Sequence, residues 1–322
     1  FKYLRGPEGT KVALKVKRSG IEKLLDFTIV RGKIPIRSIE TSFMANANTG
    51  FIKISRFSAT TYDEFMEAVE ALKKQGMQNL ILDLRGNPGG YLDAATMLAD
   101  EFLPDKKLIV YTEGKARPRK NYYATEKGDF EKGKVFVLID EGSASASEIL
   151  AGALQDWDRA EIIGRRSFGK GLVQEQTLFP DGSAMRLTVA RYYTPTGRSI
   201  QKPYKNGYMA YEEEVYDRYK HGEMVNADST HFNDSLKYTT PGGKIVYGGG
   251  GIMPDFRHIL KYMPDTSLGF FRDTMDYPLY VKEGKPKGTG HLSLALSVNG
   301  FHGAGYVDYL ASHSRTDDYS LF

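Results

Sequence analysis

A serine and a lysine, each in a segment of small residues, are the side chains best placed for covalent chemistry in this 322-residue chain. Ser145 lies in Gly142-Ser-Ala-Ser-Ala-Ser-Glu148, and Lys170 follows 25 residues later in Ser167-Phe-Gly-Lys-Gly171. A serine hydroxyl becomes an effective nucleophile only when a base takes its proton and an electrostatic pocket receives the developing oxyanion. A lysine can be that base where burial keeps it neutral. The two segments therefore make Ser145 a candidate nucleophile and Lys170 a candidate general base.

Structural roles also explain the same residues, and for such segments taken alone they are the more common outcome. Ser145-Ala-Ser-Glu148 has the pattern of a capping box, which closes the start of a helix, and a lysine in a glycine turn is usually exposed. Gly164-Arg-Arg-Ser-Phe-Gly-Lys170 also has the spacing of a phosphate-binding loop, but Gly171 stands where that loop needs Ser or Thr. The next residues alternate like a strand instead of opening a helix, which argues against nucleotide binding.

The composition excludes several other kinds of site. The chain has no cysteine, so a cysteine nucleophile, disulfides and thiolate metal sites are ruled out. All six histidines lie beyond residue 220, so a Ser-His-Asp triad could be assembled only in space, and nothing local prepares one. The net charge is only +4, and the short basic stretch Lys115–Lys120 is expected to be a solvated loop. No apolar run approaches the roughly 18 residues of a membrane span. We expect no nucleic-acid partner, no integral membrane segment, and no metal or cofactor.

Strands and helices alternate around the serine and the lysine, which predicts an α/β fold with reactive residues at strand-to-helix turns. After two strands near the start of the chain, the expected strands are 51–57, 79–85, 108–111, 135–139, 172–179 and 185–193. The expected helices begin near residues 60, 92, 145 and 211. The last two strands are joined by the turn Pro180-Asp-Gly-Ser183.

Five segments, taken in order, closely resemble the C-terminal processing peptidases, also called tail-specific proteases. They are Leu82-Asp-Leu-Arg-Gly-Asn-Pro-Gly-Gly90, Gly142–Glu148, Gly152-Ala-Leu-Gln-Asp156, Phe168–Gln174 and Tyr192-Tyr-Thr-Pro-Thr-Gly-Arg-Ser-Ile-Gln201. The resemblance covers roughly residues 1 to 201 and 249 to 255. It implies the family's serine-lysine dyad at Ser145 and Lys170, with Gln174 helping to orient the lysine. It also implies an oxyanion hole made by the backbone N–H of Ala146 and that of Gly89 or Gly90.

The same resemblance implies the domain organisation. The expected fold is α/β, a crotonase/ClpP-like peptidase core with β-rich segments, preceded by a partial PDZ domain. Residues 1–33 would be the C-terminal part of that PDZ domain, whose carboxylate-binding loop would lie upstream of Phe1. The remaining divisions are a peptidase core at 34–201, an insertion at 202–248, a return to the core at 249–264 and a C-terminal extension of unassigned role at 265–322.

By resemblance, the expected function is that of a serine endopeptidase acting through an acyl-enzyme. Its partners would be extended or unfolded polypeptide substrates cleaved near their C-termini, and its location would be the periplasm or cell envelope. The unmatched segments leave room for a homo-oligomer interface. Two alternatives share the fold: a non-catalytic peptide-binding scaffold, and an enzyme that acts on acyl thioesters. The intact serine and lysine argue against the scaffold, and no coenzyme-binding segment supports the thioester enzyme.

Overall fold

The computed structural model describes residues 4–32, 37–125, 128–204, 207–224, 234–262, 271–280 and 286–296. Its contacts divide the chain into two units, Phe1–Arg37 and Ser38–Phe322. The first unit contains an antiparallel hairpin of β1 (Lys11–Val16) and β2 (Leu25–Val30). These are the two strands predicted near the start of the chain. In their register Val12 faces Ile29 and Leu14 faces Phe27, so the apolar side chains gather on one face of the hairpin.

The second unit is built on a mixed sheet whose described strands follow the order β16-β15-β14-β9-β8-β5-β4-β3. In chain order they are β3 (Ile39–Met44), β4 (Thr49–Ile54), β5 (Asn79–Asp83), β8 (Val135–Ile139), β9 (Glu161–Gly164), β14 (Phe256–Tyr262), β15 (Phe271–Tyr280) and β16 (Pro286–Leu296). The five strands from β14 to β4 run parallel, and the outer strands pair antiparallel. The loops after β5, β8 and β9 therefore meet at one edge of the sheet.

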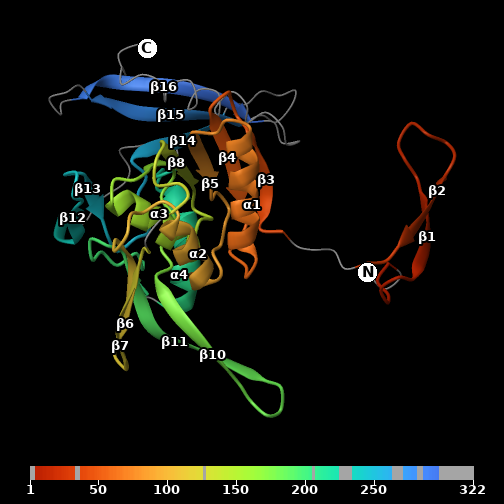
Figure 1. Cartoon of the computed structure of the whole chain (residues 1–322), viewed down its shortest axis with the longest axis horizontal. Helices are drawn as coiled ribbons and strands as arrows, with labels where there is room; N and C mark the ends of the chain where they lie inside the picture. The colour runs from red at the N-terminus through yellow and green to blue at the C-terminus, as the bar shows by residue number, and fades with distance from the viewer. Residues whose placement is uncertain are drawn as a thin grey trace. The chain divides into compact units, whose positions relative to one another are not determined.

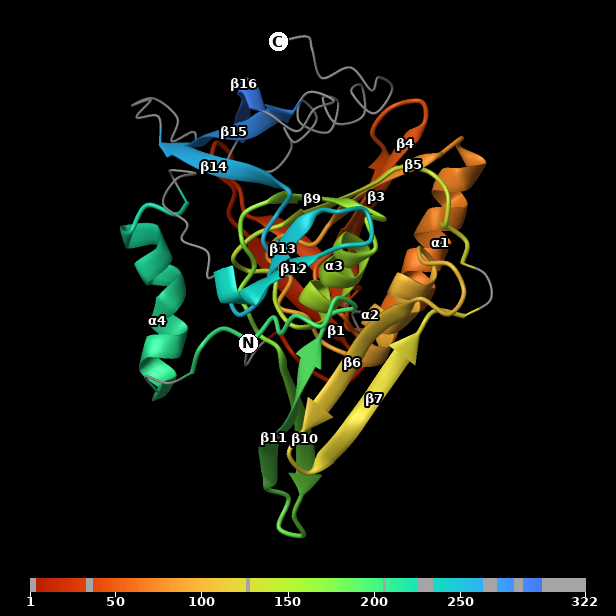
Figure 2. The same cartoon turned by 90° about the vertical axis from the view of Figure 1, so that its left-hand side faces the viewer.

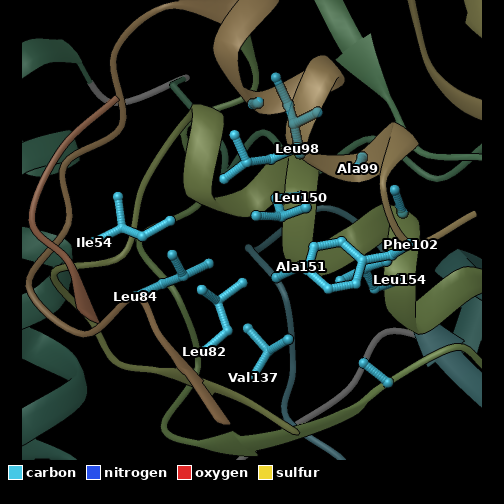
Figure 3. Packing of buried hydrophobic residues seen from close by; sticks show 14 of the residues in the cluster. Ile54, Leu82, Leu84, Leu98, Ala99, Phe102, Val137, Leu150, Ala151 and Leu154 are labelled. Carbon is cyan, nitrogen blue, oxygen red and sulfur yellow. The ribbon is translucent and has the colours of Figure 1, made fainter. Parts of the chain in front are cut away.

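Three helices pack with the parallel strands to form the main core (Figure 1). They are α1 (Thr61–Lys74), α2 (Leu92–Asp100) and α3 (Ala146–Asp156), and α2 contacts both α1 and α3. Figure 3 shows Leu82 and Val137 of the sheet facing Leu98, Leu150 and other buried residues of the helices. Every residue of α3 is buried, as expected for a helix enclosed on all sides. The start of α3 is thus fixed within a rigid core.

A second sheet has the strand order β10-β11-β6-β7. Its strands are β6 (Leu108–Gly114), β7 (Arg117–Tyr123), β10 (Leu172–Leu178) and β11 (Ala184–Tyr193). The β10–β11 hairpin extends away from the rest of the second unit in both views (Figures 1 and 2). The expectation of a loop throughout Lys115–Lys120 is wrong, because β7 begins at Arg117 and pairs with β6. β7 is an edge strand with mostly exposed side chains, so it carries no alternating apolar pattern.

The segment expected as an insertion contains α4 (Gly207–Lys220), a short 3-10 helix at Asp234–Leu236 and the hairpin of β12 (Lys237–Thr239) and β13 (Ile245–Tyr247). Figure 2 shows α4 apart from α1 and α2. The extension expected at 265–322 lies largely outside the described residues, and β15 and β16 are its described part. Among the helices that the structure describes, none has the length and apolar character needed to cross a membrane.

Candidate active site

Ser145 occupies the turn between β8 and α3, directly before the first residue of the helix. Its backbone angles, φ 55° and ψ −110°, lie in a region that residues with a Cβ rarely adopt. Such a conformation costs on the order of 1 to 3 kcal/mol and persists only where the surrounding structure enforces it. The buried helix that follows provides that enforcement. A half-buried serine on a strained strand-to-helix turn is a favourable position for a nucleophile.

Glu148, on the first turn of α3, joins the serine turn to the segment that carries the lysine. We call residues 165–171, between β9 and β10, the lysine loop. One carboxylate oxygen, Oε2, accepts hydrogen bonds from the backbone N–H of Ser145 and of Lys170, both at 2.8 Å. The other, Oε1, accepts from Ser167 Oγ at 2.5 Å and from Gly169 N at 2.7 Å. The backbones of Ser145 and Lys170 therefore lie within two hydrogen-bond lengths of each other.

Two effects act in opposite directions on the pKa of the Glu148 carboxyl. Its complete burial raises the pKa of the carboxyl, and the hydrogen bonds from Ser167, Lys170, Gly169 and Ser145 offset only part of that rise. All four partners are positioned to donate, which is the arrangement that an ionised carboxylate needs. The Ser145–Glu148 bond is the glutamate half of the predicted capping box. The bonds to the lysine loop were not predicted, because sequence spacing does not show which loop meets a helix start.

Lys170 is half-buried at the end of the lysine loop, next to β10. Two glycines flank it, and Gly169 has φ 89°, which lets the loop turn sharply just before the lysine. A neighbouring carboxylate would favour the charged ammonium. None of the described residues forms an ion pair with Lys170, and the Glu148 carboxylate binds its backbone instead.

The glycine turn after β5 lies directly against the serine. A Cβ placed on Gly89 would be 2.8 Å from both Ser145 Cβ and Ala146 N, so only glycine fits there. The N–H of Gly89 donates to Asn87 Oδ1 at 2.9 Å. In contrast, no acceptor among the described residues takes the N–H of Gly90 or of Ala146. The arrangement leaves two backbone donors near Ser145 that could receive an oxyanion.

Gln174 lies on the strand that follows the lysine loop, and no described contact joins its side chain to Ser145 or Lys170. Gln174 is exposed on β10, just after an irregularity in the pairing of that strand with β11. Within the described part of the chain, no hydrogen bond joins it to Lys170. Its spacing from Lys170 supported an orienting role, but spacing alone does not show on which side of a strand a residue lies.

Comparison with known proteins shows which families and proteins this chain resembles. Residues 48–207 match the model of peptidase family S41. The chain is 38% identical over 231 residues to a protein of Bartonella bacilliformis named carboxy-terminal-processing protease, covering 70% of this chain and 52% of that protein. It is 35% identical over 252 residues to the carboxyl-terminal-processing protease of Synechocystis, covering 77% and 58%. The solved photosystem II D1 C-terminal processing protease matches with a TM-score of 0.47 and 32% identity over 61% of this chain and 54% of that one. The chain thus spans little more than half the length of these relatives.

Proposed function

Because the chain belongs to peptidase family S41, we propose that it is a serine endopeptidase in which Ser145 is the nucleophile and Lys170 the general base. One observation carries the proposal. A single oxygen of the buried Glu148 carboxylate accepts the backbone N–H of both residues at 2.8 Å, which holds the serine turn and the lysine loop together. The strained backbone of Ser145 and the absence of an ion pair at Lys170 among the described residues support the same roles.

The proposed reaction proceeds in two halves. Ser145 Oγ attacks the carbonyl carbon of the scissile peptide bond while Lys170 Nζ takes the hydroxyl proton. The tetrahedral intermediate collapses when Lys170 returns the proton to the leaving amine, which leaves an acyl-enzyme. Water, deprotonated by Lys170, then attacks the ester, and the released Ser145 recovers its proton. We assign the oxyanion hole to the backbone N–H groups of Ala146 and Gly90, because the N–H of Gly89 is already bound by Asn87.

Gln174 is proposed to affect the orientation of Lys170 only indirectly, through the start of β10. The basis is its place four residues after the lysine, in the irregular stretch of the β10–β11 pairing. A Gln174→Ala variant should therefore lose much less activity than Lys170→Ala. Steady-state kinetics on one substrate compares the two variants, and equal losses would point to a direct role.

The substrate is proposed to be an extended or unfolded polypeptide cleaved near its C-terminus. The support is the name carboxy-terminal-processing protease carried by the relatives, together with the resemblance of the site segments. On the same basis we propose a crotonase/ClpP-like core, a PDZ origin for the β1–β2 hairpin, and export to the periplasm or cell envelope. Mass spectrometry of cleavage products locates the scissile bond, and fractionation of the source cells tests the location.

The dyad is tested by measuring cleavage of casein by Ser145→Ala and Lys170→Ala variants. Both should retain the circular dichroism and melting temperature of a folded protein and lose cleavage by at least about a hundredfold. Ser183→Ala, in the exposed β10–β11 turn, and Lys220→Ala, exposed on α4, are the matched controls and should cleave normally. Undiminished cleavage by the Lys170 variant would refute the assignment of the base. A wild-type protein that binds peptides without cleaving them would instead support a scaffold.

A further inference from the structure

The segment around α4, which matches none of the expected site motifs, makes buried contacts with the lysine loop. Arg218, on the last turn of α4, is only 5% exposed although it is an arginine. Its guanidinium donates to two backbone carbonyls of the loop, from Nη1 to Ser167 O at 3.0 Å and from Nη2 to Arg166 O at 2.6 Å. A planar group with fixed donor directions can hold two successive carbonyls in one orientation. Arg218 therefore fixes the loop backbone just before Gly169 and Lys170.

Ion pairs hold Arg218 in place. Its Nε donates a hydrogen bond to Glu223 Oε1 at 3.2 Å. The same carboxylate accepts two hydrogen bonds from Arg166, from Nε at 2.6 Å and from Nη2 at 2.7 Å. Glu214, one turn before Arg218 on α4, accepts from Arg166 at 3.3 Å. Buried charges that are paired and hydrogen-bonded in this way favour a single geometry, and removing one partner lowers the stability of the fold because it leaves the other charge buried and unpaired. The network links α4 and the turn after it to the first half of the lysine loop.

A third contact covers Phe168, the side chain at the centre of the lysine loop. Tyr211 of α4 packs edge-on against the Phe168 ring, with the ring centroids 5.7 Å apart. The Lys202 ammonium lies 3.8 Å from the same ring and pairs with Glu214 at 3.2 Å. The Lys202 backbone N–H also donates to Gly169 O at 2.9 Å. The loop is therefore held by Glu148 from the serine helix and, through different atoms, by α4 and Lys202.

We propose that α4 is a clamp for the general base, and that Arg218 is the positioning residue through which it acts. Arg218 keeps the carbonyls of Arg166 and Ser167 fixed, so that Gly169 and Lys170 stay bonded to Glu148, whose carboxylate also holds the backbone of Ser145. This inference rests on the proposed peptidase function for its kinetic consequence, although the clamp itself is a property of the fold. A misplacement of about 1 Å of a catalytic group can cost on the order of a hundredfold in rate.

The test compares Arg218→Met, Arg218→Lys and the control Lys220→Met. Methionine fills a similar volume but has no hydrogen-bond donor. Lysine keeps the positive charge, but its single ammonium group lacks the planar set of donors with which Arg218 bonds two carbonyls and Glu223. Lys220→Met removes one positive charge from the exposed face of the same helix. Peptide cleavage kinetics is measured with hydrogen exchange of the amides of residues 167–171. We expect Arg218→Met to lower kcat at least about tenfold with little change in KM and to speed exchange. Arg218→Lys should be intermediate and Lys220→Met unchanged.

The outcomes separate the clamp from the proposed function. Wild-type kcat and wild-type exchange in the Arg218→Met or Arg218→Lys variant would overturn the clamp. A loss of kcat that matches only a smaller folded fraction, with normal exchange in the folded molecules, would also overturn it. If Arg218→Met does not fold, the Arg218→Lys variant decides by the same two measurements. If the wild-type protein cleaves nothing, the peptidase proposal fails, and exchange of the loop amides still decides whether the clamp exists.

Discussion

The backbone of Ser145 carries a conformational cost that a substitution can measure. Its positive φ of 55° favours glycine over any residue with a Cβ. We expect Ser145→Gly and Ser145→Ala to be equally inactive. The glycine variant should nevertheless have the higher free energy of unfolding, by about 1 kcal/mol beyond any effect on helix capping. Chemical denaturation of the two variants gives this difference directly.

Thr60, which precedes α1, is the matched control for helix capping. It occupies the same N-cap position as Ser145 but has an ordinary φ of −98°. The stability difference between Thr60→Gly and Thr60→Ala therefore reports capping alone, which favours glycine by up to about 1 kcal/mol. If the glycine-to-alanine difference is the same at both positions, the turn at Ser145 is not strained.

Gly89 should be essential for activity because of the space it leaves. An alanine Cβ there would be 2.5 Å from Ala144 O and 2.8 Å from Ala146 N, which is one of the proposed oxyanion donors. Gly89→Ala should lower kcat by about a hundredfold or more, as loss of an oxyanion-hole donor does. Gly86 also has a positive φ, of 69°, but a Cβ there meets nothing within 4 Å. Gly86→Ala should therefore have similar backbone strain but an unchanged kcat. If both variants lose kcat to a similar extent, the effect of Gly89→Ala is not caused by its contacts with Ala144 and Ala146.

For single residues, the sequence leads to a proposal of which side chains react, and the structure adds which contacts hold them. Ser145 and Lys170 are visible because small residues flank them in ordered motifs. Glu148 is visible only as a helix-capping residue, since its bonds to Gly169 and Lys170 depend on how two loops meet in space. The choice of Gly90 over Gly89 as a free donor depends on a single hydrogen bond from the Gly89 N–H to Asn87 Oδ1. This is an Asx-turn contact, a local pattern that asparagine favours and that the predicted oxyanion hole did not include.

Among the secondary-structure elements, two buried central strands are predicted well, whereas β9, which is also buried but only four residues long, was not predicted. The apolar runs of β5 and β8 match their predicted strands closely, because parallel strands in the middle of a sheet are buried on both faces. β3 and β7 were not predicted. Both are edge strands with mostly exposed side chains, so neither has the alternation that marks a half-buried strand.

The contact between α4 and the lysine loop should weaken in acid. Burial alone would raise the pKa of Glu223, but hydrogen bonding to Arg166 and the charges of Arg218 and Arg166 bring it below the ordinary value of 4.5. A carboxyl with a lowered folded pKa contributes stability above its unfolded pKa and loses it as pH falls through the folded value. The difference in unfolding free energy between wild type and Glu223→Gln should therefore shrink steadily as pH falls below about 4.5.

This pH dependence has a control on the same helix. Glu213 is exposed on α4, and no ion pair involves it among the described residues. Glu213→Gln should differ little from wild type at any pH. Thermal unfolding of the three proteins between neutral pH and about pH 3.5 gives both comparisons. A Glu223→Gln difference that stays constant or grows in acid would show that Glu223 does not contribute through its ionised form.

For the whole molecule, the main core is contained in one of the two units. Every residue of the buried cluster, and every partly buried residue packed on it, lies between Ile39 and Ile252. The candidate site draws on loops that leave the same sheet, and Ser145, Lys170, Glu148 and α4 all belong to the second unit. The composition of the chain does not indicate this division, because both units contain apolar strands. The division into two units follows from the contacts between residues in the folded chain.

Removal of residues 1–37 should therefore leave the core and the proposed chemistry intact. The melting temperature should change by no more than about 2 °C, since none of the residues of the main core is lost. The kcat on a short peptide should also match that of the full chain, because no contact described for the dyad comes from the first unit. Leu150→Ala, which opens a cavity beside the buried face of α3, should instead cost about 2 to 5 kcal/mol and serves as the positive control. A truncated chain that unfolds at the temperature of Leu150→Ala would show that the first unit stabilises the second.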